Sequence, residues 1–230
     1  ANTKTVLKQS LSDARLEMAS MTKVMSLLLI FEAIEEGRLT LNQELICSEY
    51  AASKGGSQIF LEVGEKMKVD DLVKSVCIAS ANDATIVLAE AISGTEKTFV
   101  ERMNQKASEL NLKNTIYANA TGLPISEKHF TSAYDMAIVA SEIINKYPKV
   151  LEYSSLYEDY IRKDTPKQFW LVNTNKLIKT HPEIDGLKTG WTEAARYCLT
   201  ATQEKNGMRL ISVVMGSNTV KDRTEKTLEL

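Results

Sequence analysis

The sequence predicts an α+β protein, in which an antiparallel sheet is flanked by helices and accompanied by a mostly helical subdomain. Two observations carry this prediction. Between residues 20 and 146, apolar residues recur mostly at helical spacing. Near the C-terminus the pattern changes to alternation and is interrupted by Asn206-Gly207, a dipeptide typical of tight turns between strands. Helices first and a sheet last is the order expected of an α+β arrangement.

The first predicted helix runs from Ser20 to Glu36 and ends at Gly37, because glycine readily adopts the left-handed backbone that follows a helix. Its centre is apolar on nearly every face, which indicates a helix inside the domain. Further helices are expected over these segments: Lys68 to Ile78, Asn82 or Asp83 (as the cap) to about Ile92, Thr95 to Leu110, Ser132 (with Asp135 in a capping box) to about Lys146, and Thr219 to Leu230.

The strands are expected in the second half of the chain. Tyr197–Thr202 and Arg209–Met215 form a predicted antiparallel hairpin, with at least one strand buried on both faces, and Phe169–Val172 is an earlier strand. With 230 residues, we expect a single domain over residues 1–230, with its sheet built from both termini and its helical part over roughly residues 20–150.

Composition excludes several classes of function. The formal net charge is −2, so no broad electrostatic field attracts nucleic acid or anionic lipid. Three cysteines without C-x-x-C spacing and two histidines give no pattern for a metal, and we expect no metal and no cofactor. The apolar run Val24–Phe31 is far shorter than a membrane span, and the sequence contains no export signal.

Three short motifs carry the chemistry. Ser20-Met21-Thr22-Lys23, Ser80-Ala81-Asn82 and Lys188-Thr189-Gly190 match S-x-x-K, S-x-N and K-T-G, and each pattern occurs once. Together they supply a nucleophile, a base, a proton shuttle and a binder for an anionic substrate, which are the parts required for acyl transfer.

Ser20 is the expected nucleophile, and Lys23 lies on the same helical face at i+3. Lysine acts as a base only if its pKa falls, and burial or a second nearby cation lowers it. Ser80 is placed to pass a proton toward a leaving amine. Asn82 offers a donor and an acceptor to a substrate amide.

The third motif is expected to bind a carboxylate through Lys188 and Thr189, while Gly190 lets a ligand backbone approach a strand edge. The backbone N–H groups of Ser20 and Trp191 are the expected oxyanion donors. A Ser-His-Asp mechanism is disfavoured: there is no Gly-x-Ser-x-Gly, and no partner pattern surrounds His129 or His181.

Over nearly its whole length the chain resembles the D-alanyl-D-alanine carboxypeptidases of the low-molecular-mass penicillin-binding proteins, which share a transpeptidase fold with β-lactamases. The similar stretches are Ala19–Met25, Ser80–Ala84, Thr121–Pro124, Thr131–Met136 and Asp185–Gly190. Tyr157–Asn175 and Tyr197–Thr202 most resemble the sporulation-associated branch of spore-forming bacteria.

The resemblance implies that the chain is a single catalytic domain that removes the terminal D-alanine from peptidoglycan stem peptides ending in D-Ala-D-Ala, outside the cytoplasm in the cell envelope. It implies an acyl-enzyme on Ser20, covalent inhibition by β-lactams, and a further carboxylate ligand at Arg223.

Three departures from the family accompany the resemblance. The upstream strand is missing, as are the C-terminal β-rich domain and amphipathic anchor, so membrane anchoring is expected only through segments missing from this chain. Arg196 stands where many relatives have glycine.

Two alternatives remain open. A β-lactamase shares the motifs but needs a deacylating group, for which Glu142 and Asn145 have the nearest spacing, inside a predicted helix. The other is a non-catalytic module that β-lactams acylate without turnover.

Overall fold

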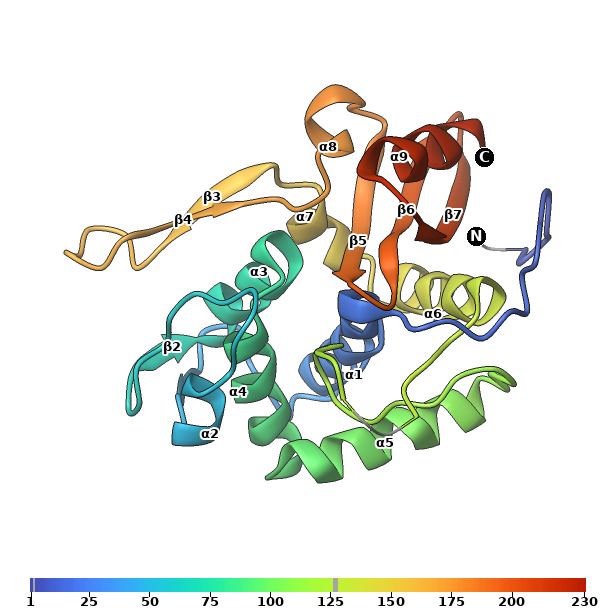
Figure 1. The fold of residues 1–230 in the computed structure, drawn as a ribbon. Helices are drawn as coiled ribbons and strands as arrows, with labels where there is room; N and C mark the ends of the chain where they lie inside the picture. The colour runs from blue at the N-terminus through green and yellow to red at the C-terminus, as the bar shows by residue number, and fades with distance from the viewer. Residues whose placement is uncertain (2, 126–127) are drawn as a thin grey trace.

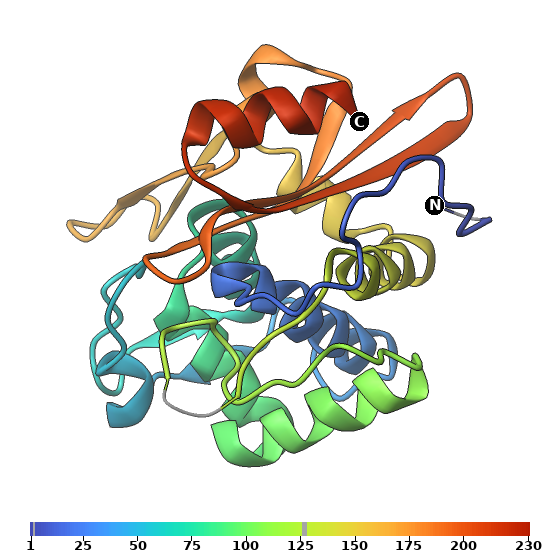
Figure 2. The ribbon, with the colours of Figure 1, turned by 45° about the vertical axis from the view of Figure 1, so that its right-hand side comes forward.

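A computed structural model describes residue 1, residues 3–125 and residues 128–230 (Figure 1). Its main sheet is antiparallel, with strands β5 (Ile184–Thr192), β6 (Arg196–Lys205) and β7 (Met208–Ser217) in that order. Helix α9 (Val220–Glu229) covers one face, and the other face rests on the 3-10 helix η1 (Ala19–Thr22), α1 (Lys23–Glu35) and α6 (Ala133–Lys146), as Figure 2 shows. The predicted α+β class is confirmed.

The helical part and two small hairpins complete the fold (Figure 1). The remaining helices are α2 (Glu49–Ala52), α3 (Val69–Ala79), α4 (Asn82–Ser93), α5 (Glu96–Glu109), α7 (Val150–Ser154) and α8 (Leu177–Thr180). The hairpins pair β1 (Glu44–Ile46) with β2 (Lys66–Lys68), and β3 (Glu158–Ile161) with β4 (Phe169–Val172). Every long predicted helix is present to within a few residues, whereas the short elements α2, α7, α8, β1, β2 and β3 were not predicted.

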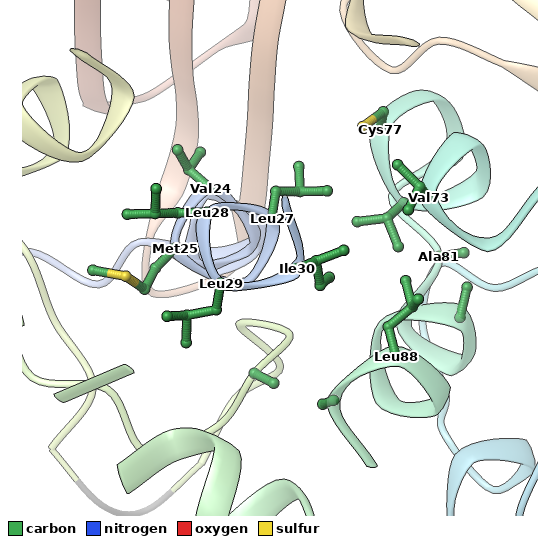
Figure 3. Close-up of a cluster of buried hydrophobic side chains, with 14 of the residues drawn as sticks. Val24, Met25, Leu27, Leu28, Leu29, Ile30, Val73, Cys77, Ala81 and Leu88 are labelled. Atoms are coloured by element: carbon green, nitrogen blue, oxygen red, sulfur yellow. The ribbon is translucent and has the colours of Figure 1, made fainter. Parts of the chain in front are cut away.

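Helix α1 is the centre of the hydrophobic core. Ten of its 13 residues are buried, and Figure 3 shows their side chains pointing outward in every direction around the helix axis. Leu27 and Ile30 face the side chains of α3 and α4, while Val24, Met25 and Leu28 point elsewhere. The prediction of an internal helix is therefore confirmed, and a lysine at its first position is carried into the core with it.

Three helix ends differ from the prediction or refine it. The helix expected from Ser20 begins as the separate 3-10 helix η1, and the α-helix starts at Lys23. The N-cap residue of helix α4 is Ala81, not Asn82 or Asp83, although the Asp83 carboxylate accepts from the Ala84 N–H in the first turn of the helix at 2.9 Å. At α6, Ser132 accepts from the Asp135 N–H as expected, but the Asp135 carboxylate accepts from Asn114 and Thr115 instead of completing the capping box.

The sheet has the predicted hairpin, with Asn206 and Gly207 at positive φ of 53° and 73° between β6 and β7. Residues 198–202 of β6 are buried in succession, so this strand is covered on both faces. The N-terminal segment was expected to add to the sheet. Its described residues form no strand, and it touches β7 through the Ala1 ammonium, which donates to Arg209 O at 2.6 Å.

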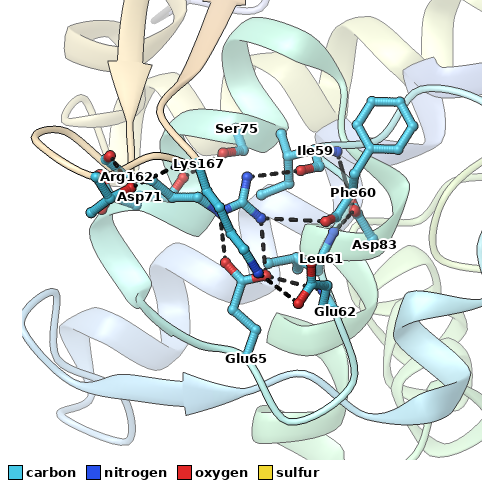
Figure 4. A network of polar contacts seen from close by, with 11 residues as sticks. Ile59, Phe60, Leu61, Glu62, Glu65, Asp71, Ser75, Asp83, Arg162 and Lys167 are labelled. Carbon is cyan, nitrogen blue, oxygen red and sulfur yellow. Dashed lines mark hydrogen bonds and ion pairs between the residues drawn. The ribbon is translucent and has the colours of Figure 1, made fainter.

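A polar clamp holds the loop of residues 59–65 between α4 and the β3–β4 hairpin (Figure 4). On the hairpin side, the Arg162 guanidinium donates to the Glu65 carboxylate at 2.6 Å and to Ile59 O at 3.0 Å. On the α4 side, the buried Asp83 carboxylate accepts from the N–H groups of Ile59 and Leu61. The loop is thus fixed from both sides, next to the Ser80-Ala81-Asn82 motif.

No helix among the described residues is long and apolar enough to cross a membrane.

Asp83→Ala is expected to lower the free energy of unfolding by about 3 kcal/mol, because it leaves buried N–H groups without acceptors and each hydrogen bond to a charged group contributes roughly 1.5–3 kcal/mol. Urea denaturation measures the change. Asp71→Ala is the control, since its half-exposed ion pair with Lys74 should contribute less than about 1 kcal/mol. Equal effects of the two substitutions would contradict the role given to Asp83.

Candidate active site

Ser20 and Lys23 meet at the junction of η1 and α1. The Lys23 ammonium nitrogen lies 3.0 Å from Ser20 Oγ and 2.6 Å from the carbonyl oxygen of Thr121. Lys23 is fully buried, whereas Ser20 is partly exposed. The structure therefore brings the predicted nucleophile and the predicted base into direct contact.

The surroundings of Lys23 favour its neutral form. Burial is the largest cause that lowers the pKa of Lys23 well below the usual value for lysine, and the nearby charge of Lys188 lowers it further, while Asp83 raises it. Burial also lowers the pKa of Lys188, to about 8. The charge of Lys188 thus disfavours protonation of Lys23, which favours the neutral amine that the predicted base requires.

The loop of residues 119–122 supplies the acceptor for Lys23. Asn119 Oδ1 accepts from the N–H groups of Thr121 and Gly122, at 3.1 and 2.6 Å, and thereby fixes the Thr121 carbonyl. Gly122 has a φ of +83°, and a Cβ added to it would lie 1.8 Å from Ala19 O. This loop, which carries part of the family resemblance, thus packs against the backbone beside Ser20.

Ser80 and Asn82 present two buried polar atoms without partners. Ser80 ends α3 in the left-handed conformation, with φ of 62°, which a residue without a glycine's freedom adopts only at a cost. Asn82 Nδ2 donates to Gly55 O at 2.7 Å. Because a carbonyl oxygen can only accept, the amide nitrogen of Asn82 faces Gly55, and Oδ1, on the other branch of the amide, is turned away from the loop that contains Gly55. Ser80 Oγ and Asn82 Oδ1 have no hydrogen-bond partner among the described residues, as expected of atoms that meet a ligand. Neither side chain is hydrogen-bonded to Ser20 or Lys23.

The K-T-G motif lies on β5, one of the two edge strands of the main sheet. The Thr189 hydroxyl donates to Thr174 Oγ1 at 2.7 Å, a neighbour that the sequence analysis did not identify. A Cβ on Gly190 would lie 2.8 Å from Met18 O. The glycine at position 190 therefore permits a close approach of β5 to the chain next to η1, and the approach of a ligand backbone to this strand edge stays a prediction. The indole of Trp191 is largely exposed.

Arg223 is buried, not the solvated helix residue that its sequence context alone indicates. Burial lowers the pKa of its guanidinium, which lies near Tyr197 and Cys198, the strand partners of Trp191 and Gly190. Its Nε has no hydrogen-bond partner among the described residues. The structure places Arg223 beside the end of β5 but not in hydrogen-bonding contact with Lys188 or Thr189.

Two further expectations concern Arg196 and Glu142. Arg196 has a φ of 58°, so it keeps the left-handed backbone that glycine would favour at this position.

Glu142 lies on α6 and forms ion pairs with Lys146 of the same helix, at 2.6 Å, and with Lys4, at 3.9 Å. Asn145 donates to Ser141. Neither Glu142 nor Asn145 contacts Ser20, so they do not form the deacylating pair of a β-lactamase.

The described residues contain no group of three or more His, Cys, Asp or Glu side chains arranged to hold a metal ion. His129 is buried and bonded to Thr22, at 2.7 Å, and is therefore not the base of a Ser-His pair with Ser20.

Comparison with solved structures defines the class first. The chain superposes on penicillin-binding protein 5 from Haemophilus influenzae with a TM-score of 0.90 and 34% sequence identity, over 98% of this chain and 66% of that one. It also superposes on penicillin-binding protein D2 from Listeria monocytogenes in its ampicillin-bound form, with a TM-score of 0.84 and 30% identity over 97% and 90% of the two chains. The fold is therefore that of the penicillin-binding proteins.

Sequence comparison then gives the family. The sequence model of the D-alanyl-D-alanine carboxypeptidase family, peptidase family S11, matches residues 1–219. The carboxypeptidase DacF of Bacillus subtilis is 52% identical over 98% of this chain and 57% of its own length, and DacC of Escherichia coli is 33% identical over 98% and 56%. The chain belongs to the D-alanyl-D-alanine carboxypeptidase family, and it spans little more than half the length of these relatives.

Gly122→Ala is expected to reduce the rate of Ser20 acylation by more than about 10-fold, because the added Cβ collides with the Ala19 carbonyl and requires an unfavourable positive φ. Gly94→Ala is the matched control: its φ is also positive, at +77°, but a Cβ there meets nothing within 4 Å. Stopped-flow acylation by a chromogenic cephalosporin measures both variants. A Gly122→Ala enzyme that reacts as fast as Gly94→Ala would contradict the close packing described here.

Proposed function

We propose that this chain is the catalytic domain of a serine-type D-Ala-D-Ala carboxypeptidase, which removes the terminal D-alanine of peptidoglycan stem peptides through an acyl-enzyme on Ser20. The single observation that carries the proposal is the 3.0 Å contact between Ser20 Oγ and the buried Lys23 ammonium nitrogen. Family membership supports the substrate class. The envelope location expected from the family, and any membrane anchoring, belong to the same proposal.

In the acylation step, neutral Lys23 accepts the proton of Ser20 as Oγ attacks the carbonyl carbon of the penultimate D-alanine. The developing oxyanion is held by the N–H groups of Ser20 and Trp191. The C–N bond then breaks, and the amine nitrogen of the terminal D-alanine receives a proton through Ser80, whose hydroxyl is buried without a protein partner. Water hydrolyses the ester and returns the enzyme to its starting state.

Substrate binding is assigned to the two walls of the site. Asn82 Oδ1, unpaired and turned away from its Gly55 anchor, accepts an amide N–H of the peptide. On the opposite wall Lys188 and Thr189 bind the terminal carboxylate, and Arg223 contributes positive charge from beside the end of β5. Gly190 contributes by allowing β5 to lie close to η1. β-Lactams react at the same serine because the lactam carbonyl replaces the scissile amide.

Release of D-alanine is the decisive measurement. A peptide ending in D-Ala-D-Ala should be converted with multiple turnovers, and intact-mass spectrometry after penicillin treatment should show one adduct, on the peptide that contains Ser20. The Ser20→Ala variant should do neither. Labelling without turnover of the peptide would favour a non-catalytic penicillin-binding module, and rapid turnover of penicillin itself would favour a β-lactamase.

The pH dependence of kcat/KM should be bell-shaped for a D-Ala-D-Ala peptide. Activity rises with pH as Lys23 loses its proton and becomes a base. It falls above about pH 8, where Lys188 loses the charge that holds the carboxylate. The C-terminal amide of the same peptide is the control, because it has no carboxylate to lose and should lack the alkaline fall. Identical profiles for acid and amide would contradict the assignment of Lys188.

Arg223→Ala should reduce cleavage of the free-acid peptide more than cleavage of its C-terminal amide. Removing one charge-assisted partner of the carboxylate costs on the order of 1.5–3 kcal/mol, equivalent to about 10- to 150-fold. Arg223→Lys is the matched variant, since it keeps the charge and should recover part of the loss. A ratio of acid to amide efficiencies that is unchanged in both variants would place Arg223 outside the carboxylate site.

A further inference from the structure

A chain of three hydrogen bonds leads from His129 to the backbone next to Ser20. The Ala118 N–H donates to His129 Nδ1 at 2.9 Å, His129 Nε2 lies 2.7 Å from Thr22 Oγ1, and Thr22 Oγ1 donates to Ala19 O at 2.7 Å. All three links are buried or partly buried. The four residues joined by these bonds have no role in the mechanism above, whereas the serine that follows Ala19 is the proposed nucleophile.

The direction of each bond follows from the chemistry of its ends. A backbone N–H only donates, so Nδ1 of His129 carries a lone pair and the ring proton is on Nε2. Nε2 therefore donates to the Thr22 hydroxyl, whose own proton points to the Ala19 carbonyl. Burial lowers the pKa of His129 to about 4, so the imidazole is neutral near pH 7. The charged side chains that share a hollow with His129 are Arg15, Glu17 and Lys128.

The carbonyl of Ala19 and the N–H of Ser20 belong to the same planar peptide unit, in which they point in opposite directions. Fixing the carbonyl oxygen therefore fixes the direction of the Ser20 N–H. A hydrogen bond received by the carbonyl also polarises the unit and strengthens the N–H as a donor. As the second residue of η1, Ser20 has no acceptor for its N–H inside that helix.

Ala19 needs this support because its backbone is strained. Its φ is +46°, a left-handed conformation that alanine rarely adopts and that persists only where the surroundings impose it. Gly122 leaves the space beside Ala19 O. The Thr22 hydroxyl then occupies the hydrogen-bonding direction of that oxygen, and His129 holds the hydroxyl in place.

We propose that His129, acting through Thr22, is a positioning residue that orients and polarises the Ser20 N–H as an oxyanion donor. This rests on the proposed acyl-enzyme mechanism. The imidazole touches neither the substrate nor the nucleophile, and its contribution is to the geometry of one peptide unit.

Two substitutions at His129 test its two hydrogen bonds, to Ala118 and to Thr22, one at a time. In His129→Gln, the side-chain nitrogen reaches the place of Nε2 and still donates to Thr22, but the acceptor for Ala118 is lost. In His129→Asn, Oδ1 takes the place of Nδ1 and still accepts from Ala118, but the donor to Thr22 is lost. Each variant loses one of the two hydrogen bonds of His129, and each keeps the other. At Thr22, Thr22→Val removes the hydroxyl and Thr22→Ser keeps it.

The first measurement is the acylation rate with penicillin. Because deleting an oxyanion donor costs about 100- to 1,000-fold, a misdirected donor in His129→Asn and Thr22→Val should cost about 10-fold or more. His129→Gln and Thr22→Ser should stay within about 3-fold of wild type. Thermal unfolding of all four variants establishes that each is folded.

The second measurement is the infrared band of the ester carbonyl in the Ser20 acyl-enzyme. This band moves to higher frequency when the hydrogen bonds to the carbonyl oxygen weaken, and a general loss of stability does not move it. We expect the upward shift in His129→Asn and Thr22→Val only. Equal rates and equal band positions for His129→Asn and His129→Gln in folded protein would overturn the proposal. If wild-type protein forms no Ser20 ester at all, the proposed function fails instead.

Discussion

The burial of Lys23 is the constraint on which the rest of the site depends. An ammonium group without water is costly, and the protein meets that cost by favouring the neutral amine, by giving the nitrogen two acceptors and by placing it at the start of the central core helix. The same burial that makes α1 a stable core element also lowers the pKa of its first residue, which favours the role of base proposed for it. A change that exposed Lys23 to water would therefore alter both the packing of α1 and the pKa of the lysine.

Close packing of backbone around η1 is the second requirement. Gly122 and Gly190 lie on either side of the segment from Met18 to Met21, and a Cβ at either position would collide with its carbonyl oxygens. The strained backbone of Ala19 and the left-handed Ser80 show the same principle on a smaller scale, since both conformations are imposed by their neighbours. Close packing of this kind leaves the backbone of the site little room to move, and a preorganised site is the condition for effective electrostatic stabilisation of a transition state.

The sequence predicted most of the long elements because their signals are local. Helical periodicity, Gly37 after α1 and Asn206-Gly207 between β6 and β7 are all readable without tertiary contacts. The contact of Ser20 with Lys23 was likewise predictable, since the spacing of three residues places both on one face. The short hairpins and helices carry too few residues for a periodic pattern and form only through contacts with other segments.

Other parts of the site could not be read from the sequence because they depend on contacts over long separations. Thr174 meets Thr189, and Asn119 fixes the loop that holds Lys23, but neither residue type is distinctive by itself. Asp83 was expected only as a helix cap, but its carboxylate accepts both from the first turn of α4 and from the N–H groups of another loop. Arg223 was placed near the site through the family resemblance; its burial follows from the packing of α9 on the sheet.

The clamp on residues 59–65 has a consequence for the order in which the protein can assemble. Arg162 holds Ile59 O across a separation of 103 residues, so the loop beside Asn82 is secured only when a segment far along the chain has docked. Contacts of such separation form slowly, because the entropy of closing the intervening chain must be lost before they contribute. We therefore expect newly made chains to form their helices, whose contacts are local, before this wall of the site. Competence to acylate should accordingly appear later in refolding than helical structure does.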